Sequence, residues 1–137
     1  MIPSRIAVDM SATLLHHGHI RLLKAASKLG TVVVLLSSDN EIKEHKGYLP
    51  ELDFGARREI LDSIEYVDEV IESPWVISNE FMRQHGLDVL VHGEDNANLV
   101  TEFSVVLYPR TLGVSSSDLR RRSAAIHAEM ESGVASD

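Results

Sequence analysis

Short apolar segments alternate with amphipathic segments along this chain, and this alternation limits the fold more than any other feature. Residues 5–8 and 31–36 are apolar runs without polar alternation, which is typical of strands buried on both faces of a parallel sheet. Between them, residues 19–29 place leucines and alanines on one helical face, and Gly30 ends the helix. The beginning of the chain therefore predicts a strand, a helix and a second, parallel strand.

The same alternation continues toward the C-terminus. It predicts helices at residues 54–65 and 79–85, strands at 66–71, 89–92 and 105–108, and a last helix from Ser115 or Ser116 to Met130. Strands that alternate with helices form a doubly wound parallel sheet, because right-handed crossovers place the helices on its faces. We expect a single Rossmann-like α/β domain with a sheet of about five strands. Residues 131–137 are expected to be a flexible C-terminal tail.

The composition excludes several classes of protein. The chain has 137 residues, enough for one domain, and no cysteine, which excludes disulfides, thiolate metal sites and a cysteine nucleophile. Its net charge of -8 disfavours a broad nucleic-acid-binding face. The apolar runs are too short to cross a membrane, and the N-terminus does not resemble a signal peptide. We therefore expect a cytoplasmic protein without nucleic-acid or membrane partners.

Doubly wound sheets bind ligands at the carboxyl ends of their strands. Neither a Walker loop nor G-x-G-x-x-G follows the first strand, so the commonest phosphate-binding loops are excluded. Trp75 and Phe81 are interpreted as core or interface packing. Four segments follow predicted strands, and these are the candidates for a site: residues 10–19, 37–46, 93–98 and 109–117.

The segment His16-His17-Gly18-His19 lies immediately before a helix, where free backbone N–H groups and the helix dipole favour an anion. His16 and His19 can face the same side and donate hydrogen bonds to phosphate oxygens, and Gly18 lets the chain approach a ligand closely. Such donors stabilise charge that develops on a bridging phosphate. Two alternatives stay open: core or capping histidines, and a metal site of His16, His17 and His19.

A second candidate segment follows the last predicted strand and opens the last helix. Its sequence is Arg110-Thr111-Leu112-Gly113-Val114-Ser115-Ser116-Ser117. The segment offers a fixed cation, hydroxyl groups and backbone N–H groups at another strand end. Serine-rich helix starts are also common caps, so this segment alone does not distinguish a site from a cap.

Taken together, these motifs resemble those of the H-x-G-H nucleotidyltransferases, specifically the glycerol-3-phosphate and ethanolamine-phosphate cytidylyltransferases. Residues 14–19 are similar to L-L-H-x-G-H, and residues 110–117 are similar to R-T-x-G-[IV]-S-T-T. Residues 41–47 resemble the lysine-bearing loop of the ethanolamine-phosphate enzymes, residues 66–71 resemble [YW]-V-D-E-V-[IV], and residues 91–95 resemble V-H-G-x-D. The likeness covers most of the chain and assigns residues 1–130 to one nucleotidyltransferase domain.

This resemblance implies transfer of CMP from CTP to a phosphorylated or phosphonylated small alcohol, such as glycerol-3-phosphate or phosphoethanolamine, with release of pyrophosphate. The alternatives are an adenylyltransferase that uses ATP on a sugar or cofactor phosphate, and a catalytically weakened nucleotide-binding module. Mg²⁺ is expected to arrive with the nucleoside triphosphate, without a dedicated metal site on the protein. A homodimer is also implied, with residues 66–71 in its interface.

The resemblance further implies roles for individual residues. The implied catalytic residues are His16, His19, Lys46 and Arg110. The implied nucleotide-binding residues are Ser11, Ala12, Gly18, His92, Gly93, Asp95, Thr111, Gly113, Ser115 and Ser116. Arg57 and Lys43 are implied to hold the phosphate of the acceptor.

Three segments differ from the pattern of the family, the first being Met10-Ser11-Ala12-Thr13. Relatives carry G-[TC]-F-D at residues 10–13, so Thr13 stands where they have a carboxylate. Glu44 stands where the glycerol-3-phosphate enzymes have the first lysine of K-x-K, and Glu65 stands where relatives have Arg or Lys. These differences prompt the alternative of a weakened module.

Overall fold

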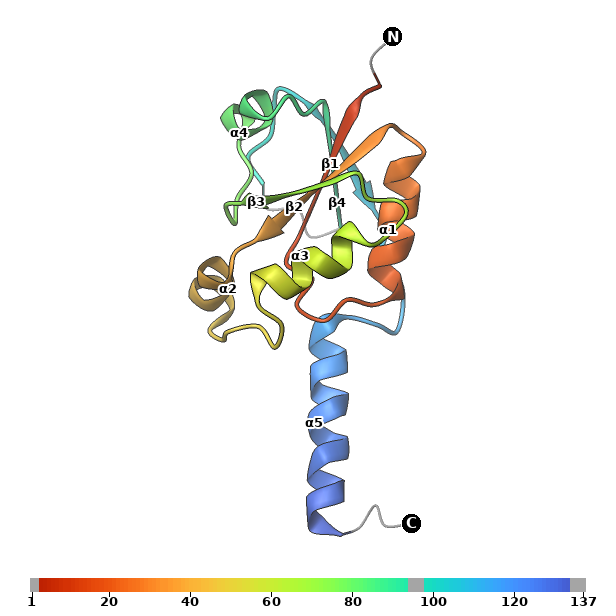
Figure 1. The fold of residues 1–137 in the computed structure, drawn as a ribbon, viewed down its shortest axis with the longest axis vertical. Helices are drawn as coiled ribbons and strands as arrows, with labels where there is room; N and C mark the ends of the chain where they lie inside the picture. The colour runs from red at the N-terminus through yellow and green to blue at the C-terminus, as the bar shows by residue number, and fades with distance from the viewer. Residues whose placement is uncertain (1–2, 94–97, 134–137) are drawn as a thin grey trace.

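The computed structural model describes residues 3–93 and 98–133 and contains one five-stranded sheet (Figure 1). The neighbouring strands are parallel, in the order β3-β2-β1-β4-β5. The elements in chain order are β1 Arg5–Met10, α1 His17–Ser27, β2 Thr31–Ser37, α2 Asp39–Lys46, α3 Phe54–Asp62, β3 Glu69–Ser73, α4 Asn79–Gln84, β4 Val89–Gly93, β5 Ser104–Tyr108 and α5 Ser116–Ser132.

The central strands bury side chains on both faces of the sheet. Ile6 and Val8 of β1 belong to one buried cluster together with Leu23 of α1, whereas Ala7 belongs to a second cluster with Met82 of α4. Successive side chains of a strand point to opposite faces, so a strand without polar residues needs a cover on each face. Helices α1 and α3 supply one cover, and α4 supplies the other. The predicted Rossmann-like α/β fold is confirmed.

One predicted strand is displaced along the sequence. Residues 66–71 were expected to be a strand, but β3 begins only at Glu69. The preceding residues form turns after α3, and the Val67 N–H donates to the Ile64 carbonyl at 3.0 Å. Asp68 then meets β2 through its carboxylate, which accepts from the Val32 N–H at 2.8 Å. The Asp68 carboxylate thus replaces a backbone carbonyl as the acceptor for the Val32 N–H, and β3 begins only after it.

Helix α2 forms in a segment for which the sequence pattern predicted neither a helix nor a strand. Ser38 caps its start, since the Ser38 Oγ accepts from the Glu41 N–H at 3.2 Å. Gly47 ends it with a φ of 82°, a conformation that glycine adopts without strain. Serine followed three residues later by glutamate is a sequence signature of a helix start. The helix carries Lys46 to the carboxyl edge of the sheet.

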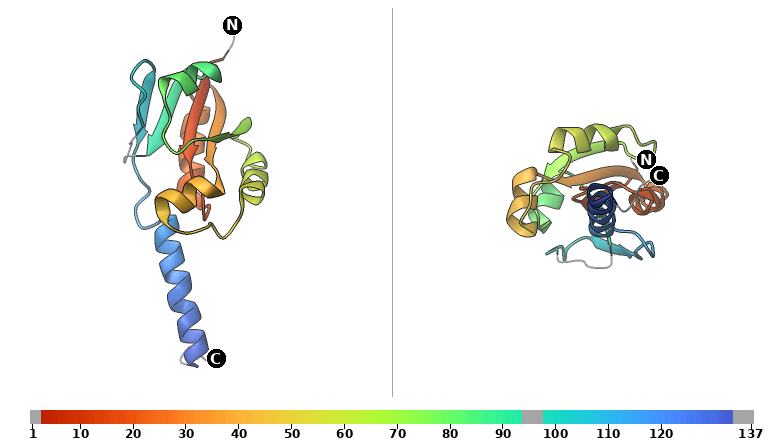
Figure 2. Two further views of the ribbon diagram at one scale, coloured as in Figure 1. Left: turned by 90° about the vertical axis from the view of Figure 1, so that its left-hand side faces the viewer. Right: turned by 90° about the horizontal axis from the view of Figure 1, so that it is seen from below.

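The last helix lies apart from the sheet. Ser115 caps α5 by accepting from the Asp118 N–H at 3.0 Å, and the helix continues to Ser132, beyond the expected end at Met130. Figures 1 and 2 show α5 projecting away from the body of the protein. None of its residues is buried, whereas each of the other helices buries at least one. None of the helices in the described ranges is long and apolar enough to cross a membrane.

The order of the strands fixes where a ligand can bind. The chain runs outward from β1 to β2 and β3, and then returns to place β4 and β5 on the other side of β1. The segments that follow β1 and β4 therefore diverge and open a crevice between them. Asp9 lies near the end of β1 and His92 near the end of β4, so both lie at this crevice.

Candidate active site

Two adjoining cavities lie at the carboxyl edge of the sheet, with volumes of about 260 and 340 Å³. The smaller, hereafter the α1–α5 cavity, lies between the first turns of α1 and α5. The larger, hereafter the α2 cavity, is bounded by the end of α2 and the ends of β1 and β4. Ser11, Lys46 and Arg110 line both, so the two cavities form one crevice with two parts.

Two imidazole rings cap α1 in the wall of the α1–α5 cavity. The His16 Nδ1 accepts from the Gly18 N–H at 3.0 Å, and the His19 Nδ1 accepts from the His16 N–H at 3.1 Å. Because Nδ1 is the acceptor in both rings, the neutral form of each carries its proton on Nε2. The capping alternative and the anion-binding alternative are therefore compatible: one ring nitrogen caps the helix, and the other is a donor for a ligand.

Both rings are neutral at pH 7. Burial, together with a smaller contribution from the charge of His17, lowers the pKa of His16. Burial lowers the pKa of His19 to about 4, with contributions in the same direction from the charges of His16 and Lys46. A bound phosphate would favour the charged forms and so raise both pKa values.

No side chain fits at Gly18, because the His16 ring occupies the space. A Cβ atom there would lie 2.7 Å from the His16 Cε1 and 3.4 Å from the Thr111 Cβ. The first distance is too short for a Cβ atom, whereas the second is at the short limit of ordinary van der Waals contact. The glycine therefore lets His16 fold back over the helix start and lets the segment of Thr111 approach α1.

The first turn of α5 forms the opposite wall of the α1–α5 cavity. Thr111, Ser115 and Ser116 line it, and Gly113 makes the preceding turn with a φ of 81°. The Ser116 Oγ donates to the Leu14 carbonyl at 2.9 Å, which joins the two distant motifs directly. Two helix N-termini therefore border one cavity, an arrangement that favours a polyanion.

Lys46 lies at the boundary between the two cavities. Its Nζ donates to the Ser11 Oγ at 3.2 Å and lies 5.9 Å from the centre of the Trp75 ring. Trp75 lines the α2 cavity and stacks on His45, with ring centres 4.7 Å apart. Trp75 thus packs against His45 beside the cavity and belongs to neither buried cluster, whereas Phe81 packs against the core as expected.

The α2 cavity contains a carboxylate that no sequence motif singles out. The Asp9 Oδ1 pairs with the His92 Nδ1, and the Asp9 Oδ2 accepts from the Asn98 Nδ2 at 2.9 Å. All three residues line the cavity. The available sequence signal was the position of Asp9, the first polar residue at the end of an apolar strand.

Arg57 and Lys43, the implied ligands of the acceptor phosphate, line neither cavity. Arg57 is only 2% exposed. Its guanidinium donates to the Ser11 carbonyl at 2.7 Å, the Ser37 carbonyl at 2.9 Å and the Asp39 carboxylate at 2.7 Å. Arg57 thus joins the ends of β1 and β2 to the start of α2. Lys43 is exposed on α2.

The remaining implied residues are distributed over both cavities. Gly93 lines both, and Ala12 lines the α2 cavity with an unusual positive φ of 47°. Asp95 lies outside the described residues. Thr13 is fully buried and lines neither cavity, and its Oγ1 has no hydrogen-bond partner among the described residues. An unpaired buried hydroxyl costs about 1 to 3 kcal/mol.

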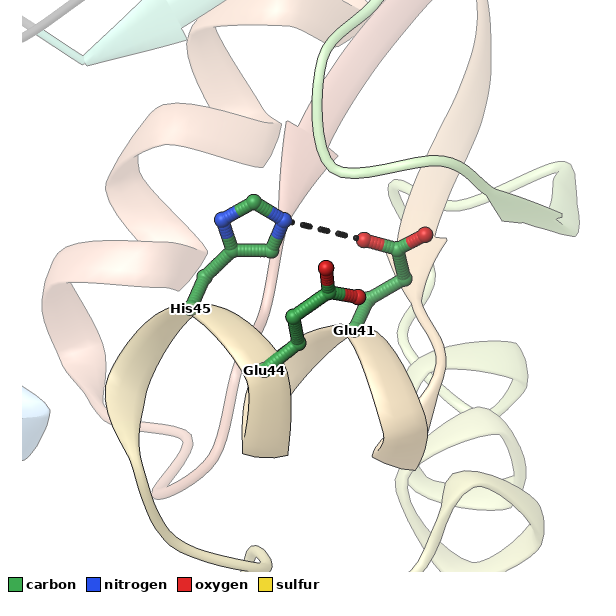
Figure 3. Close-up of side chains that lie close together, drawn as sticks. All are labelled: Glu41, Glu44 and His45. Atoms are coloured by element: carbon green, nitrogen blue, oxygen red, sulfur yellow. Dashed lines mark ion pairs between the residues drawn. The ribbon is translucent and has the colours of Figure 1, made fainter.

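In the part of the chain that the structure describes, one group of side chains is close enough to hold a metal ion, and it comprises Glu41, Glu44 and His45 (Figure 3). Figure 3 shows the three on one face of α2, where the Glu41 Oε2 lies 3.3 Å from the His45 Nε2. None of them lines a cavity, and they form a helix-surface ion pair with a neighbouring carboxylate. Among the described residues, His16, His17 and His19 do not form such a group, although they were considered as a metal site.

An anion that enters the α1–α5 cavity meets helix N-termini, neutral imidazole donors and the cations of Lys46 and Arg110. A crevice of this kind at the switch point of a doubly wound sheet defines a nucleotide-binding α/β protein. The family described as cytidylyltransferase-like matches residues 12–122. The chain belongs to the cytidylyltransferase-like family, and the family resemblance indicated by the motifs is confirmed.

Similar proteins agree with this assignment. The chain is 36% identical over 118 residues to the glycerol-3-phosphate cytidylyltransferase of Bacillus subtilis, which covers 82% of this chain and 92% of that protein. It is 31% identical over 133 residues to the ethanolamine-phosphate cytidylyltransferase of Arabidopsis thaliana, which covers 85% of this chain and 31% of that protein. The lipopolysaccharide core biosynthesis protein of Thermoplasma volcanium shares the fold, with a TM-score of 0.64 at 22% identity, over 79% of this chain and 96% of that one.

Proposed function

We propose that this protein transfers CMP from CTP to the phosphate, or phosphonate, of a small alcohol such as glycerol-3-phosphate or phosphoethanolamine, and releases pyrophosphate. One observation carries the proposal: the two family motifs, distant in sequence, meet across one cavity through the hydrogen bond from Ser116 to Leu14. The names of the two similar enzymes supply the substrate class.

In this reaction an oxygen of the acceptor phosphate attacks the α-phosphorus of CTP, and the bond to the pyrophosphate oxygen breaks. Positioning and charge neutralisation supply the catalysis, because the chemistry needs no covalent intermediate with the enzyme. The Nε2–H groups of His16 and His19 donate to the nucleotide phosphates, and Arg110 neutralises charge on the leaving pyrophosphate. Lys46 lines both cavities and can contact the phosphates of both substrates.

The two cavities suggest separate places for the two substrates. The triphosphate occupies the α1–α5 cavity, where the helix N-termini lie. The acceptor occupies the α2 cavity, where Asp9 is held by His92 and Asn98. This assignment departs from the expectation that Ala12 and His92, which line the same cavity, bind the nucleotide. A carboxylate fixed in this way accepts a hydrogen bond from a hydroxyl or amino group of the acceptor.

Mg²⁺ belongs to the proposal as an ion carried by the triphosphate, where it screens charge that the nucleophile must approach. The donor set of the site agrees with this role. Asp9 is the one carboxylate among the described residues that line the cavities, and it is already paired with His92 and Asn98. Phosphate oxygens and water, rather than a protein cage, would therefore hold the ion.

A homodimer and a cytoplasmic location are also part of the proposal. The residues implied for the dimer interface, 66–71, include the start of β3, which is an edge strand of the sheet. An edge strand presents unpaired backbone groups that a second chain can contact.

The direct test measures pyrophosphate release by the purified protein with Mg²⁺, CTP and a panel of acceptors: glycerol-3-phosphate, phosphoethanolamine, phosphocholine and phosphonates. We expect turnover with at least one acceptor and much less with ATP. Calorimetry with CTP and with ATP separates the cytidylyl from the adenylyl alternative. Tight CTP binding without turnover on any acceptor would support the weakened module, and absence of both binding and turnover would sink the proposal.

A further inference from the structure

One cluster of side chains joins α5 to the segment that follows α2. The Arg120 guanidinium donates to both oxygens of the Glu51 carboxylate, at 2.6 and 2.7 Å, and to the Tyr48 hydroxyl at 2.9 Å. Its Cζ also lies 4.3 Å from the centre of the Tyr48 ring. These three residues, hereafter the Arg120 clamp, line neither cavity. A role of the clamp in the reaction would therefore have to be indirect.

The geometry of the Arg120 clamp differs from that of most surface ion pairs. Two hydrogen bonds between one guanidinium and one carboxylate fix the orientation of both groups, and the aromatic ring beside the guanidinium restricts it further. The hydrogen bond from Arg120 lowers the pKa of the Glu51 carboxyl below its ordinary value. Isolated exposed pairs contribute little, but a bidentate pair held by a third group fixes the segments that carry it.

The two segments that the clamp joins both carry residues of the site. Tyr48 lies two residues after Lys46, which lines both cavities. Arg120 lies about one helical turn after Ser116, which lines the α1–α5 cavity. The partners within the clamp are 69 and 72 positions apart in the chain. The clamp therefore fixes a separation between α2 and α5 that neither helix determines alone.

Few other contacts hold these two helix ends in the described part of the chain. Helix α5 buries no residue, and its other side-chain hydrogen bonds to a distant segment join Ser116 and Leu14. Arg57 fixes the start of α2, whereas the Lys46 side chain at its end donates to Ser11 at 3.2 Å. The clamp thus adds a second attachment to α5 and holds the segment into which α2 continues.

We propose that Arg120 is a positioning residue for the transfer reaction: through Glu51 and Tyr48, it sets the position of Lys46 relative to the first turn of α5. This inference rests on the proposed function, in which Lys46 contacts the phosphates of both substrates and α5 contacts the triphosphate. Misplacement of a positioned group by about 1 Å can cost about 10²-fold in rate, even when the cause lies far from the reacting atoms. Arg120 therefore supports catalysis without touching either substrate.

The first experiment uses Trp75, the single tryptophan of the chain, and needs no substrate. Its ring stacks on His45 and lies 5.9 Å from the Lys46 Nζ, so its environment depends on the end of α2. Arg120→Met should increase acrylamide quenching of Trp75 about twofold, because the end of α2 then opens more often. Arg121→Met is the matched control, since Arg121 is exposed and pairs within α5, and it should leave quenching unchanged.

The second experiment tests whether Arg120 acts through Lys46. Arg120→Met is expected to lower kcat about tenfold in the otherwise unmodified chain, but less than about twofold in Lys46→Met. Independent effects would add on a free-energy scale, so a tenfold loss in both backgrounds would identify a purely structural role. Combining Arg120→Glu with Glu51→Arg should recover part of the rate that either single change removes, because the ion pair forms again in the opposite sense.

Four results would overturn the proposal: quenching that Arg120→Met leaves unchanged, equal quenching in Arg121→Met, additive losses with Lys46→Met, or no recovery when the charges are exchanged. Circular dichroism verifies that each variant is folded. If the unmodified chain turned over no acceptor, the proposed function would fail, whereas quenching of Trp75 would still decide whether Arg120 holds the end of α2.

Discussion

The α1–α5 cavity and the α2 cavity differ in how their polar groups are held. In the α1–α5 cavity, His16 and His19 are fixed by backbone groups within a few residues of themselves. In the α2 cavity, Asp9 is fixed by His92 and Asn98, which lie 83 and 89 positions further along the chain. One part of the site is therefore set by local helix capping and the other by the packing of distant strands. Substitutions should affect the two parts differently.

The largest effect is expected in the α1–α5 cavity. His19→Ala removes a donor to the triphosphate, and we expect kcat/KM to fall about 10³-fold. His17 is exposed on the same turn and lines neither cavity, so His17→Ala should stay within about twofold of the unmodified protein. Steady-state kinetics with circular dichroism as a folding control measures both. Equal losses in the two variants would contradict a specific role for His19.

The next effect concerns Arg57, which lines neither cavity but holds the ends of β1 and β2 in place. Arg57→Met leaves the carbonyls of Ser11 and Ser37 and the carboxylate of Asp39 without their partner, so we expect a loss of about 3 kcal/mol in the free energy of unfolding. Urea denaturation measures this loss. Arg58→Met is the matched control, because the Arg58 side chain is 51% exposed and should change stability by less than about 0.5 kcal/mol.

Lys46 tests whether the two cavities act together. Lys46→Met removes a cation that lines both, and we expect kcat to fall about 10²-fold, with higher KM values for both substrates. Lys43→Met, on the same helix but outside the cavities, should change neither constant by more than about twofold. If Lys43→Met instead raised the acceptor KM strongly, α2 would have to reorient when the acceptor binds.

Acidification should weaken the α1–α5 part of the fold. The pKa of His19 is lowered to about 4 in the folded chain and is about 6.5 when unfolded. The unfolded chain therefore binds more protons between these values, so stability is complete above pH 6.5 and is lost as the pH falls toward 4. Since His19 is partly exposed, we expect about 2 kcal/mol. Thermal unfolding of His19→Gln between pH 6.5 and 4 should show a smaller loss of stability than the unmodified chain. An identical pH dependence in the two proteins would contradict this role of His19.

The smallest effect is expected in the α2 cavity. Asp9→Asn keeps the shape of the side chain but removes the charge, and we expect the acceptor KM to rise about tenfold while the KM for CTP stays unchanged. Initial rates at varied concentrations of each substrate separate the two constants. A change in the KM for CTP alone would exchange the assignments of the two cavities.

The fold was largely predictable because buried parallel strands leave apolar runs in the sequence. β1, β2, β4 and β5 were predicted near their observed positions. The start of β3 was not, because it depends on the Asp68 carboxylate bonding to Val32 of a neighbouring strand. Helix α2 was missed although its signals, Ser38 followed by Glu41 and then Gly47, are local.

The site was predictable only where local chemistry fixes it. The motif of His16 and His19 and the start of α5 are each a run of consecutive residues, and the structure brings the two segments together at one cavity. Asp9 gave only its position at the end of an apolar strand, and Trp75 gave no local signal, since their contacts with His92 and His45 arise from tertiary packing. The position of Arg57 in the sequence does not show which way its side chain points. Its partners include the Ser11 and Ser37 carbonyls at the ends of β1 and β2, which only the folded sheet brings close to it.

Helix α5 begins in the wall of the α1–α5 cavity and ends far from it, so a small rotation at its start would move its end by a larger distance. Its 17 residues span about 25 Å, and a tilt of about 10° at Ser116 would carry Ser132 through about 4 Å. A fluorescent label near Ser132 would thus register a tilt of this size as a change in distance. Any tilt of α5 that accompanies binding could then be followed from outside the site, without a label on its lining residues.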